Sequence, residues 1–146
     1  MAFNPTPQQE TAIYAVGNTL VSAAAGSGKT AVLVERVIKA ITREENPISA
    51  DKLLIVTFTN AAANEMRTRI EKRLREECVA HPNNITLTLQ CHLLNNAKIC
   101  TIDSFCIDLV RDNFDKLNIP PDFKIGEGAT LTAINENVFY GCTGLT

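Results

Sequence analysis

Helical periodicity marks two long stretches of this chain. Apolar residues recur at the spacing of a helix face in residues 31–41 and again in residues 61–77, so each stretch should form a helix with one buried side. The positions expected to face the core are Val34, Val37, Ile38 and Ile41 in the first helix and Met66, Ile70 and Leu74 in the second. The remaining face of the second helix carries charges of both signs, which indicates a solvated surface.

Short segments predict strands around these helices, of which residues 53–57 are a continuous apolar run. Residues 18–22 and 53–57 flank the first helix, with a turn at Gly17 and Asn18 before it, and residues 99–102 form a third run. A continuous apolar run is typical of a strand buried on both faces of a parallel sheet. Strand, helix and strand in this order make a βαβ unit, so the expected fold class is α/β, with a parallel sheet flanked by helices.

Capping residues predict further helices. Thr6, Pro7 and Gln9 are arranged as in a capping box, so a short helix should begin near Pro7. Ser104 can cap a helix over residues 105–115. The inner face expected for that helix comprises Ile107, Val110, Arg111 and Phe114. Residues 85–96 fit strand and helix periodicity equally, and residues 131–139 are expected to hold one further helical stretch.

The strongest chemical signal lies in residues 21–30, Val-Ser-Ala-Ala-Ala-Gly-Ser-Gly-Lys-Thr. Small residues between a strand and a helix allow backbone N–H groups to approach a phosphate closely, and Gly26 and Gly28 supply the freedom to turn. The helix start, the Lys29 ammonium ion and the Thr30 hydroxyl would then hold a triphosphate and Mg²⁺. Ala23 stands where the strict P-loop pattern has glycine, so the match is to a relaxed form.

Composition narrows the class of protein. With 146 residues, of which 45% are hydrophobic, the chain is expected to form one globular domain. A net charge of -2 provides no global basic field, so a contact with nucleic acid would have to be local. No signal peptide or membrane span is predicted, so we expect a cytoplasmic protein. The five cysteines lack C-x-x-C spacing and are expected to be reduced and partly buried.

Two polar loops follow expected strands, where open α/β sheets bind ligands. Phe58 in the first loop is either a platform on which an unpaired base stacks, with Thr59 and Asn60 on backbone phosphates, or a core residue that closes the strand. In the second loop, Asp103 ends an apolar run and is a candidate Walker B ligand for Mg²⁺. No Glu follows it, and the chain contains no Asp-Glu pair. Gln9 likewise has two open roles, a helix cap or hydrogen bonds to an adenine edge.

Four segments together resemble motifs of the UvrD-type superfamily of DNA helicases, and among these the N-terminal region of AddA-type subunits of helicase-nucleases. Residues 9–13 resemble the Q motif, residues 23–36 motif I, residues 57–66 motif Ia and residues 101–106 motif Ib. Their order and spacing agree with the family from about residue 6 to about residue 125. This family carries alanine at the position of Ala23.

The resemblance implies a RecA-like P-loop NTPase fold that binds ATP and Mg²⁺. ATP would contact Gln9, Ala23, Ala24, Ala25, Gly26, Ser27, Gly28, Lys29 and Thr30. Lys29 would be the catalytic residue and Thr30 the metal ligand. Single-stranded DNA would contact Phe58, Thr59, Asn60, Thr101, Ser104 and Phe105. Asp103 would then belong to this DNA-binding motif, where many family members have His, and residues 85–96 would be helical.

The resemblance also implies a role in the parent protein. That protein would be an ATP-dependent DNA helicase and exonuclease of double-strand-break repair and recombination, with an AddB-like partner subunit. Residues 1–125 would form the N-terminal part of its first motor domain, and residues 126–146 a weakly specified tail. The later motifs, with their Asp-Glu pair and arginine finger, lie outside this sequence, so the chain alone is expected not to unwind DNA.

Two other hypotheses stay open. A self-contained P-loop nucleotide-binding module without a motor would use Asp103 for Mg²⁺, so Asp103→Asn would abolish Mg²⁺-dependent ATP binding. A truncated product without function would show no measurable affinity for ATP. The motor hypothesis instead predicts DNA binding that Phe58→Ala weakens.

Overall fold

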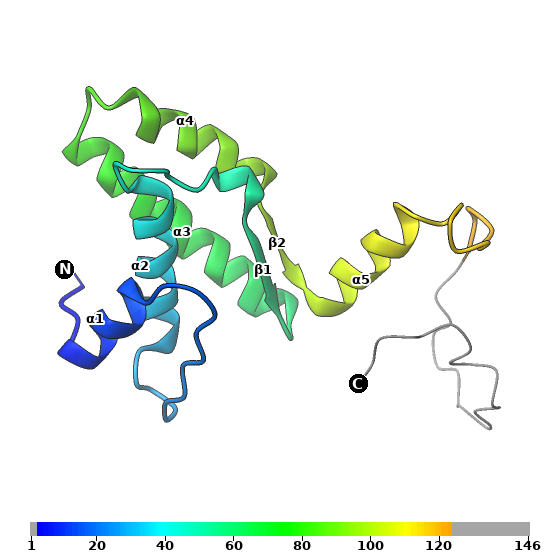
Figure 1. Cartoon of the computed structure of the whole chain (residues 1–146), viewed down its shortest axis with the longest axis horizontal. Coiled ribbons are helices and arrows are strands. Elements are labelled where there is room, and N and C mark those ends of the chain that lie inside the picture. The colour runs from blue at the N-terminus through cyan, green and yellow to red at the C-terminus, as the bar shows by residue number, and fades with distance from the viewer. Residues whose placement is uncertain (1–2, 124–146) are drawn as a thin grey trace. The chain divides into compact units, whose positions relative to one another are not determined.

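The computed structural model describes residues 3–123 of the chain. The helices and strands (Figure 1) are, in chain order, α1 Pro7–Tyr14, α2 Lys29–Thr42, β1 Leu54–Thr57, α3 Asn60–Ala80, α4 Ile85–Leu93, β2 Lys98–Thr101 and α5 Ile102–Arg111. Two short 3-10 helices, η1 Ala50–Lys52 and η2 Leu94–Asn96, precede the strands. The chain divides after Leu109 into two compact units. The described residues of the second unit are 110–123.

β1 and β2 lie side by side as a parallel pair. Leu54 is opposite Lys98 and Thr57 is opposite Thr101, so both strands end at the same edge of the sheet. The connection between them runs through α3 and α4 (Figure 1), as parallel strands require a crossover. The predicted mixed α/β architecture with parallel strands and flanking helices is therefore confirmed for this unit.

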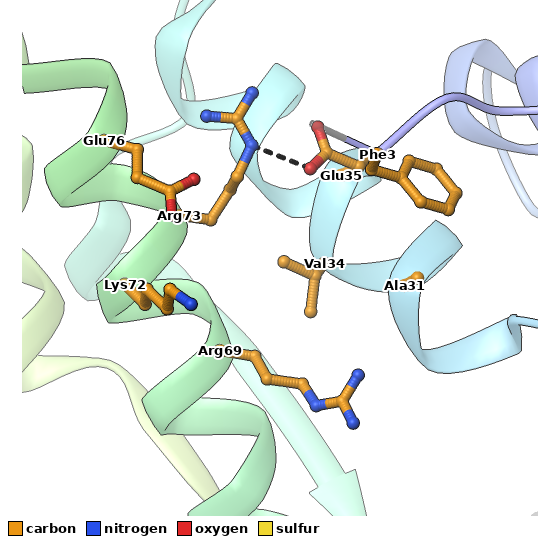
Figure 2. A pocket seen from close by; sticks show the side chains of 8 residues that line it. All are labelled: Phe3, Ala31, Val34, Glu35, Arg69, Lys72, Arg73 and Glu76. Carbon is orange, nitrogen blue, oxygen red and sulfur yellow. Dashed lines mark hydrogen bonds and ion pairs between the residues drawn. The ribbon is translucent and has the colours of Figure 1, made fainter. Parts of the chain in front are cut away.

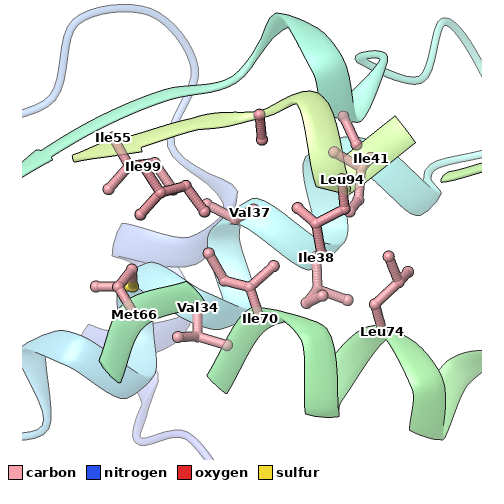
Figure 3. Packing of buried hydrophobic residues seen from close by; sticks show 12 residues of the cluster. Val34, Val37, Ile38, Ile41, Ile55, Met66, Ile70, Leu74, Leu94 and Ile99 are labelled. Atoms are coloured by element: carbon pink, nitrogen blue, oxygen red, sulfur yellow. The ribbon is translucent and has the colours of Figure 1, made fainter. Parts of the chain in front are cut away.

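One apolar cluster joins α2, α3 and the sheet. Figure 3 shows side chains from both helices directed into this cluster, below Ile55 of β1 and Ile99 of β2. All seven positions predicted to face the core from α2 and α3 are buried. They are Val34, Val37, Ile38, Ile41, Met66, Ile70 and Leu74. The periodicity of the two helices therefore identified most of the core.

The outer face of β1 differs from the prediction. Ile55 is buried, but Leu54 and Val56 on the opposite face are 50% and 45% exposed. The expectation that this strand is buried on both faces is wrong for the part of the chain that the structure describes. The reason is that the apolar cluster lies on the Ile55 side of the sheet, so alternate residues of β1 face away from it.

The strand expected at residues 18–22 is absent. These residues form an extended connection from α1 to α2, in which Leu20 is 96% exposed. A strand satisfies its backbone groups by pairing with a neighbouring strand, and within residues 3–123 the sheet contains β1 and β2 alone. The predicted turn before this segment is present, since Gly17 has a positive φ of 76°.

Capping side chains set the starts of α1 and α4. Thr6 and Gln9 form the predicted capping box of α1, with the Thr6 N–H donating to Gln9 Oε1 over 2.8 Å. Asn84 caps α4, because its Oδ1 accepts a hydrogen bond from the N–H of Leu87. Residues 85–93 are therefore helical, as the family resemblance implies. The stretch at 131–139 lies outside the described residues.

The boundaries of α5 also differ from the prediction. Thr101 Oγ1 accepts a hydrogen bond from the Ser104 N–H over 3.1 Å, so the helix begins at Ile102 and Ser104 is not its cap. α5 ends at Arg111, and none of its residues is buried. The expected inner face is therefore wrong for Ile107, Val110 and Arg111, and Phe114 lies beyond the helix and is exposed. Helical periodicity shows that a helix has an apolar face. That face becomes buried only where another element packs against it.

The described residues contain no helix with both the length and the apolar character needed to cross a membrane. Their longest helix, α3, extends over 21 residues from Asn60 to Ala80, and its outer face is densely charged. Charges of both signs at this density would have to be desolvated in a bilayer.

The burial of the core predicts that the same substitution has different effects on the free energy of unfolding at a buried and at an exposed position. Ile70→Ala should lower the free energy of unfolding by about 2–5 kcal/mol, because Ile70 is wholly buried in the cluster and its removal leaves a cavity. Ile85→Ala, the same change at a residue of α4 that is 83% exposed, should alter it by less than about 0.5 kcal/mol. Urea unfolding followed by circular dichroism measures both. Equal losses in the two variants would contradict the assignment of the core.

Candidate functional site

Two glycines direct the chain into the start of α2. Gly26 and Gly28 have φ angles of 77° and 85°, in the left-handed region that favours glycine. Gly28 precedes the first residue of α2, and no side chain caps this helix. The N–H groups of its first turn therefore face the exposed loop, where the oxygens of an anion can accept their hydrogen bonds.

The Lys29 side chain folds back across the loop. Its Nζ donates hydrogen bonds to the carbonyl oxygens of Ala23, over 2.6 Å, and Ala24, over 2.7 Å. The Ser27 N–H also donates to the Ala24 carbonyl, over 3.3 Å, which closes the loop as a turn. An ammonium ion next to an uncapped helix start offers a positive charge and free N–H donors, which are the groups that an anion such as phosphate requires.

Thr30 is the metal ligand that the family resemblance implies. It is exposed, and it is the second residue of α2. The described residues contain no group of three or more His, Cys, Asp or Glu side chains that can hold a metal ion. Mg²⁺ takes many of its ligands from nucleotide phosphates and water, so Thr30 would have to act together with a bound nucleotide.

Gln9 connects α1 to the loop. Its Oε1 accepts from the Thr6 N–H, as the capping box requires, while its Nε2 donates to the Ser27 carbonyl over 3.1 Å. A methyl group added at Gly28 would lie 3.1 Å from this Nε2, so the Gln9 side chain would have to shift by a few tenths of an ångström. A carboxamide has two N–H donors and two lone pairs. One N–H and one lone pair of Gln9 are not used by these two hydrogen bonds. They are left for an adenine edge, so the capping role and adenine recognition are compatible.

Arg36 holds α1 against α2 and was not identified from the sequence. Its Nη1 donates to the carbonyls of Ala12, over 2.7 Å, and Ile13, over 3.4 Å, near the end of α1. Both acceptors are backbone atoms more than 20 residues away in sequence. No side-chain pattern signals such a contact, so sequence could reveal it only through the tertiary structure.

The carboxyl edge of the sheet brings the two polar loops together. Thr57 and Thr101 are opposite each other in the register, so the residues that follow them start from neighbouring positions. Phe58 is 92% exposed, which excludes the alternative that it closes the core. The Thr59 hydroxyl caps α3 by accepting from the Ala62 N–H over 3.2 Å.

The second loop is shorter than expected, because β2 leads directly into α5. Thr101 is buried, and its Oγ1 donates to Ser104 Oγ over 2.8 Å, so it orients the Ser104 side chain. Phe105 is half-buried, and Asp103 is exposed in the first turn of α5. A carboxylate there is stabilised by the positive end of the helix dipole.

A separate cavity of about 350 Å³ opens between α2 and α3 (Figure 2). Glu35 on one wall accepts a hydrogen bond from Arg73 Nε over 2.8 Å, and Arg73 also pairs with Glu77 over 2.6 Å. Burial lowers the pKa of Arg73, but the hydrogen bonds to both glutamates outweigh it and raise the pKa above its ordinary value. The ion pair between Glu35 and Arg73 links α2 to α3. Residues 23–30 do not line this cavity.

Comparison with known proteins decides the family. Residues 5–141 match the family described as UvrD/REP helicase N-terminal domain. The chain belongs to this family. The matched range contains all four motifs noted in the sequence, from Gln9 to Cys106. The UvrD/REP assignment thus confirms the family resemblance.

Three relatives of this UvrD/REP domain are named as subunits of an ATP-dependent helicase/nuclease. The protein of Clostridium novyi is 50% identical over 137 residues, which are 93% of this chain and 11% of that protein. The proteins of Clostridium acetobutylicum and Clostridioides difficile are 51% and 56% identical over 85% and 75% of this chain. The chain spans about a tenth of the length of these relatives.

The contact between Gln9 and the loop predicts different effects for two substitutions. Gln9→Glu keeps an acceptor for the Thr6 N–H but places a carboxylate oxygen against the Ser27 carbonyl, so it should cost about 1 kcal/mol of stability. Gln9→Ala removes both hydrogen bonds and should cost more. Amide hydrogen exchange should accelerate in residues 26–28 in both variants, and in α1 only in Gln9→Ala. Unchanged exchange of residues 26–28 in Gln9→Glu would contradict the contact.

Proposed function

We propose that this chain binds ATP with Mg²⁺ and single-stranded DNA, as the front part of the motor of an ATP-dependent DNA helicase/nuclease. The observation that carries the proposal is the uncapped start of α2, with Lys29 folded into a loop of small residues. Membership of the UvrD/REP family and the names of the relatives support it.

ATP would bind along residues 23–30. Backbone N–H groups of the loop and of the first turn of α2 would donate to the phosphate oxygens, and Lys29 would exchange its two carbonyl partners for them. Thr30 would ligate Mg²⁺, which when bound neutralises phosphate charge. The remaining N–H and lone pair of Gln9 would read the adenine.

Single-stranded DNA would lie across the carboxyl edge of the sheet. Phe58 offers an exposed ring on which one base can stack. Asn60 and Ser104 offer polar groups for the backbone, and Thr59 and Phe105 shape the surface around them. Thr101 is buried and would act on the DNA only by orienting Ser104. Because α2 and α3 share one core, a change at the nucleotide would reach the DNA edge through packed helices.

The biological setting is part of the same proposal. A helicase and nuclease of this kind would act in double-strand-break repair and recombination, in the cytoplasm, with an AddB-like partner subunit. The names of the relatives support the helicase and nuclease components. A self-contained P-loop module that uses Asp103 for Mg²⁺ is the competing proposal, since Asp103 is an exposed carboxylate after a strand.

The nucleotide site predicts that Lys29→Ala weakens binding of Mg²⁺-ATP by about 10- to 100-fold, the value of a lost charge-assisted contact. Lys39→Ala, which removes an exposed lysine from the last turn of the same helix, should leave the affinity unchanged. Fluorescence of a labelled ATP analogue measures both. Asp103→Asn should also leave it unchanged, whereas a loss comparable to that of Lys29→Ala would favour the self-contained module.

The DNA site predicts that Phe58→Ala weakens binding of a fluorescent oligothymidine by about 5- to 100-fold, the equivalent of one lost stacking contact. Affinity for ATP should be preserved, because Phe58 is not part of the loop at residues 23–30. Ile85→Ala removes an equally exposed apolar side chain from α4 and serves as the control. Fluorescence anisotropy of the oligonucleotide measures the change. The same loss in both variants would contradict a stacking role for Phe58.

A further inference from the structure

Two cysteines meet where α3 and α4 pack together. Cys78 lies in the last turn of α3 and Cys91 in α4, and the chain reverses direction between these helices at residues 81–84. Their Sγ atoms are 3.0 Å apart. A disulfide has an S–S length of about 2.05 Å, so a movement of about 1 Å would bring the two sulfurs to bonding distance. Their spacing in sequence gives no sign of this proximity.

Burial and packing suit this pair to reaction with a small molecule. Both cysteines are free thiols and both are half-buried. A small oxidant can therefore reach the sulfur atoms, whereas the surface of a second protein has little access to them. Cys91 packs against the apolar cluster, next to Leu93 and Leu94. The backbone of both helices is therefore held in place, and the sulfur atoms stay close together.

The surroundings of Cys91 control the protonation of its thiol. Burial, together with a hydrogen bond to Cys78, raises the pKa of the Cys91 thiol to about 11. Cys91 therefore keeps its proton near neutral pH, where it can donate its S–H to Cys78. The thiolate is the reactive form of cysteine, so Cys91 is a poor first nucleophile and is suited to the second step.

We propose that Cys78 and Cys91 form a reversible disulfide, a redox modification site that fastens α4 to α3. The oxidant is a small-molecule disulfide such as oxidised glutathione. Cys78 attacks one of its sulfurs and releases one glutathione thiolate, which takes a proton. Cys91 then gives up its proton, attacks the Cys78 sulfur of the mixed disulfide and releases the second glutathione. The two cysteines lose two electrons, and the oxidant gains them as two thiols.

The bond would act on the segment that enters β1. α4 also carries Gln90, which is buried and accepts from the Ala50 N–H over 2.8 Å while its Nε2 donates to the Ile48 carbonyl over 3.2 Å. A covalent tie from α3 to α4 would therefore restrain η1 and the approach to β1. The DNA-binding residues at the start of α3 lie at the other end of that helix, and the tie does not touch them.

The peptide map of the full chain tests the proposal directly. The protein is incubated with oxidised glutathione, remaining thiols are alkylated, and trypsin is added. Residues 76–98 contain both cysteines with no Lys or Arg before the last position, so the proposed bond appears as this one peptide, unalkylated and lighter by two hydrogen atoms. Dithiothreitol should restore two alkylation sites. A disulfide that joins this peptide to one carrying Cys100, Cys106 or Cys142 would overturn the proposal.

Thermal unfolding supplies an independent measurement. Oxidation should raise the unfolding midpoint by about 10 °C, because the bond closes a short loop in the unfolded chain. Cys78→Ser and Cys91→Ser should abolish this shift, whereas Cys106→Ser, at an exposed cysteine of α5, should retain it. If a serine variant does not fold, the peptide map of the unmodified chain decides alone. Alkylation of both cysteines of residues 76–98 after prolonged oxidation would overturn the proposal.

Discussion

The apolar contact between α2 and α3 fixes the relation between the two candidate binding sites. α2 begins at the end of the loop at residues 23–28, and α3 begins directly after the exposed Phe58 and Thr59. Ile38 and Ile41 of α2 and Ile70 and Leu74 of α3 are almost wholly buried in one cluster. Each such side chain stabilises the fold by about 1.5–3 kcal/mol. The Glu35 and Arg73 pair adds a directional contact between the same helices, so both loops are positioned by a single core.

Features determined by local interactions could be predicted from the sequence. A helix satisfies most of its backbone hydrogen bonds internally and needs only one apolar face, and the buried positions of α2 and α3 follow their spacing. The capping box of α1 likewise depends on Thr6 and Gln9, three residues apart. The P-loop depends on small residues before Lys29 in direct succession. Its roles in binding ATP and Mg²⁺ stay predictions, as do those of the DNA-binding residues.

Features that need a distant partner could not be predicted. Residues 18–22 are apolar enough for a strand, but a strand forms only beside another one. The residue that caps α5 is Thr101 and not the predicted Ser104. A hydroxyl at either position fits the local sequence pattern, and the position at which β2 ends determines which of the two caps the helix. The contacts of Gln9 with Ser27, Arg36 with Ala12 and Cys78 with Cys91 join residues on different elements. No periodicity within one segment encodes them.

The two hydrogen bonds of Lys29 give the loop at residues 23–30 a stable arrangement of its own. An incoming anion must displace the carbonyls of Ala23 and Ala24 from the ammonium ion before it gains that charge. A ligand with a single weak acceptor gains little from this competition, whereas a chain of phosphates presents several strong acceptors and also reaches the uncapped N–H groups of α2. If the loop binds ATP as proposed, it would therefore favour ligands that bring several oxygens over anions that offer a single acceptor.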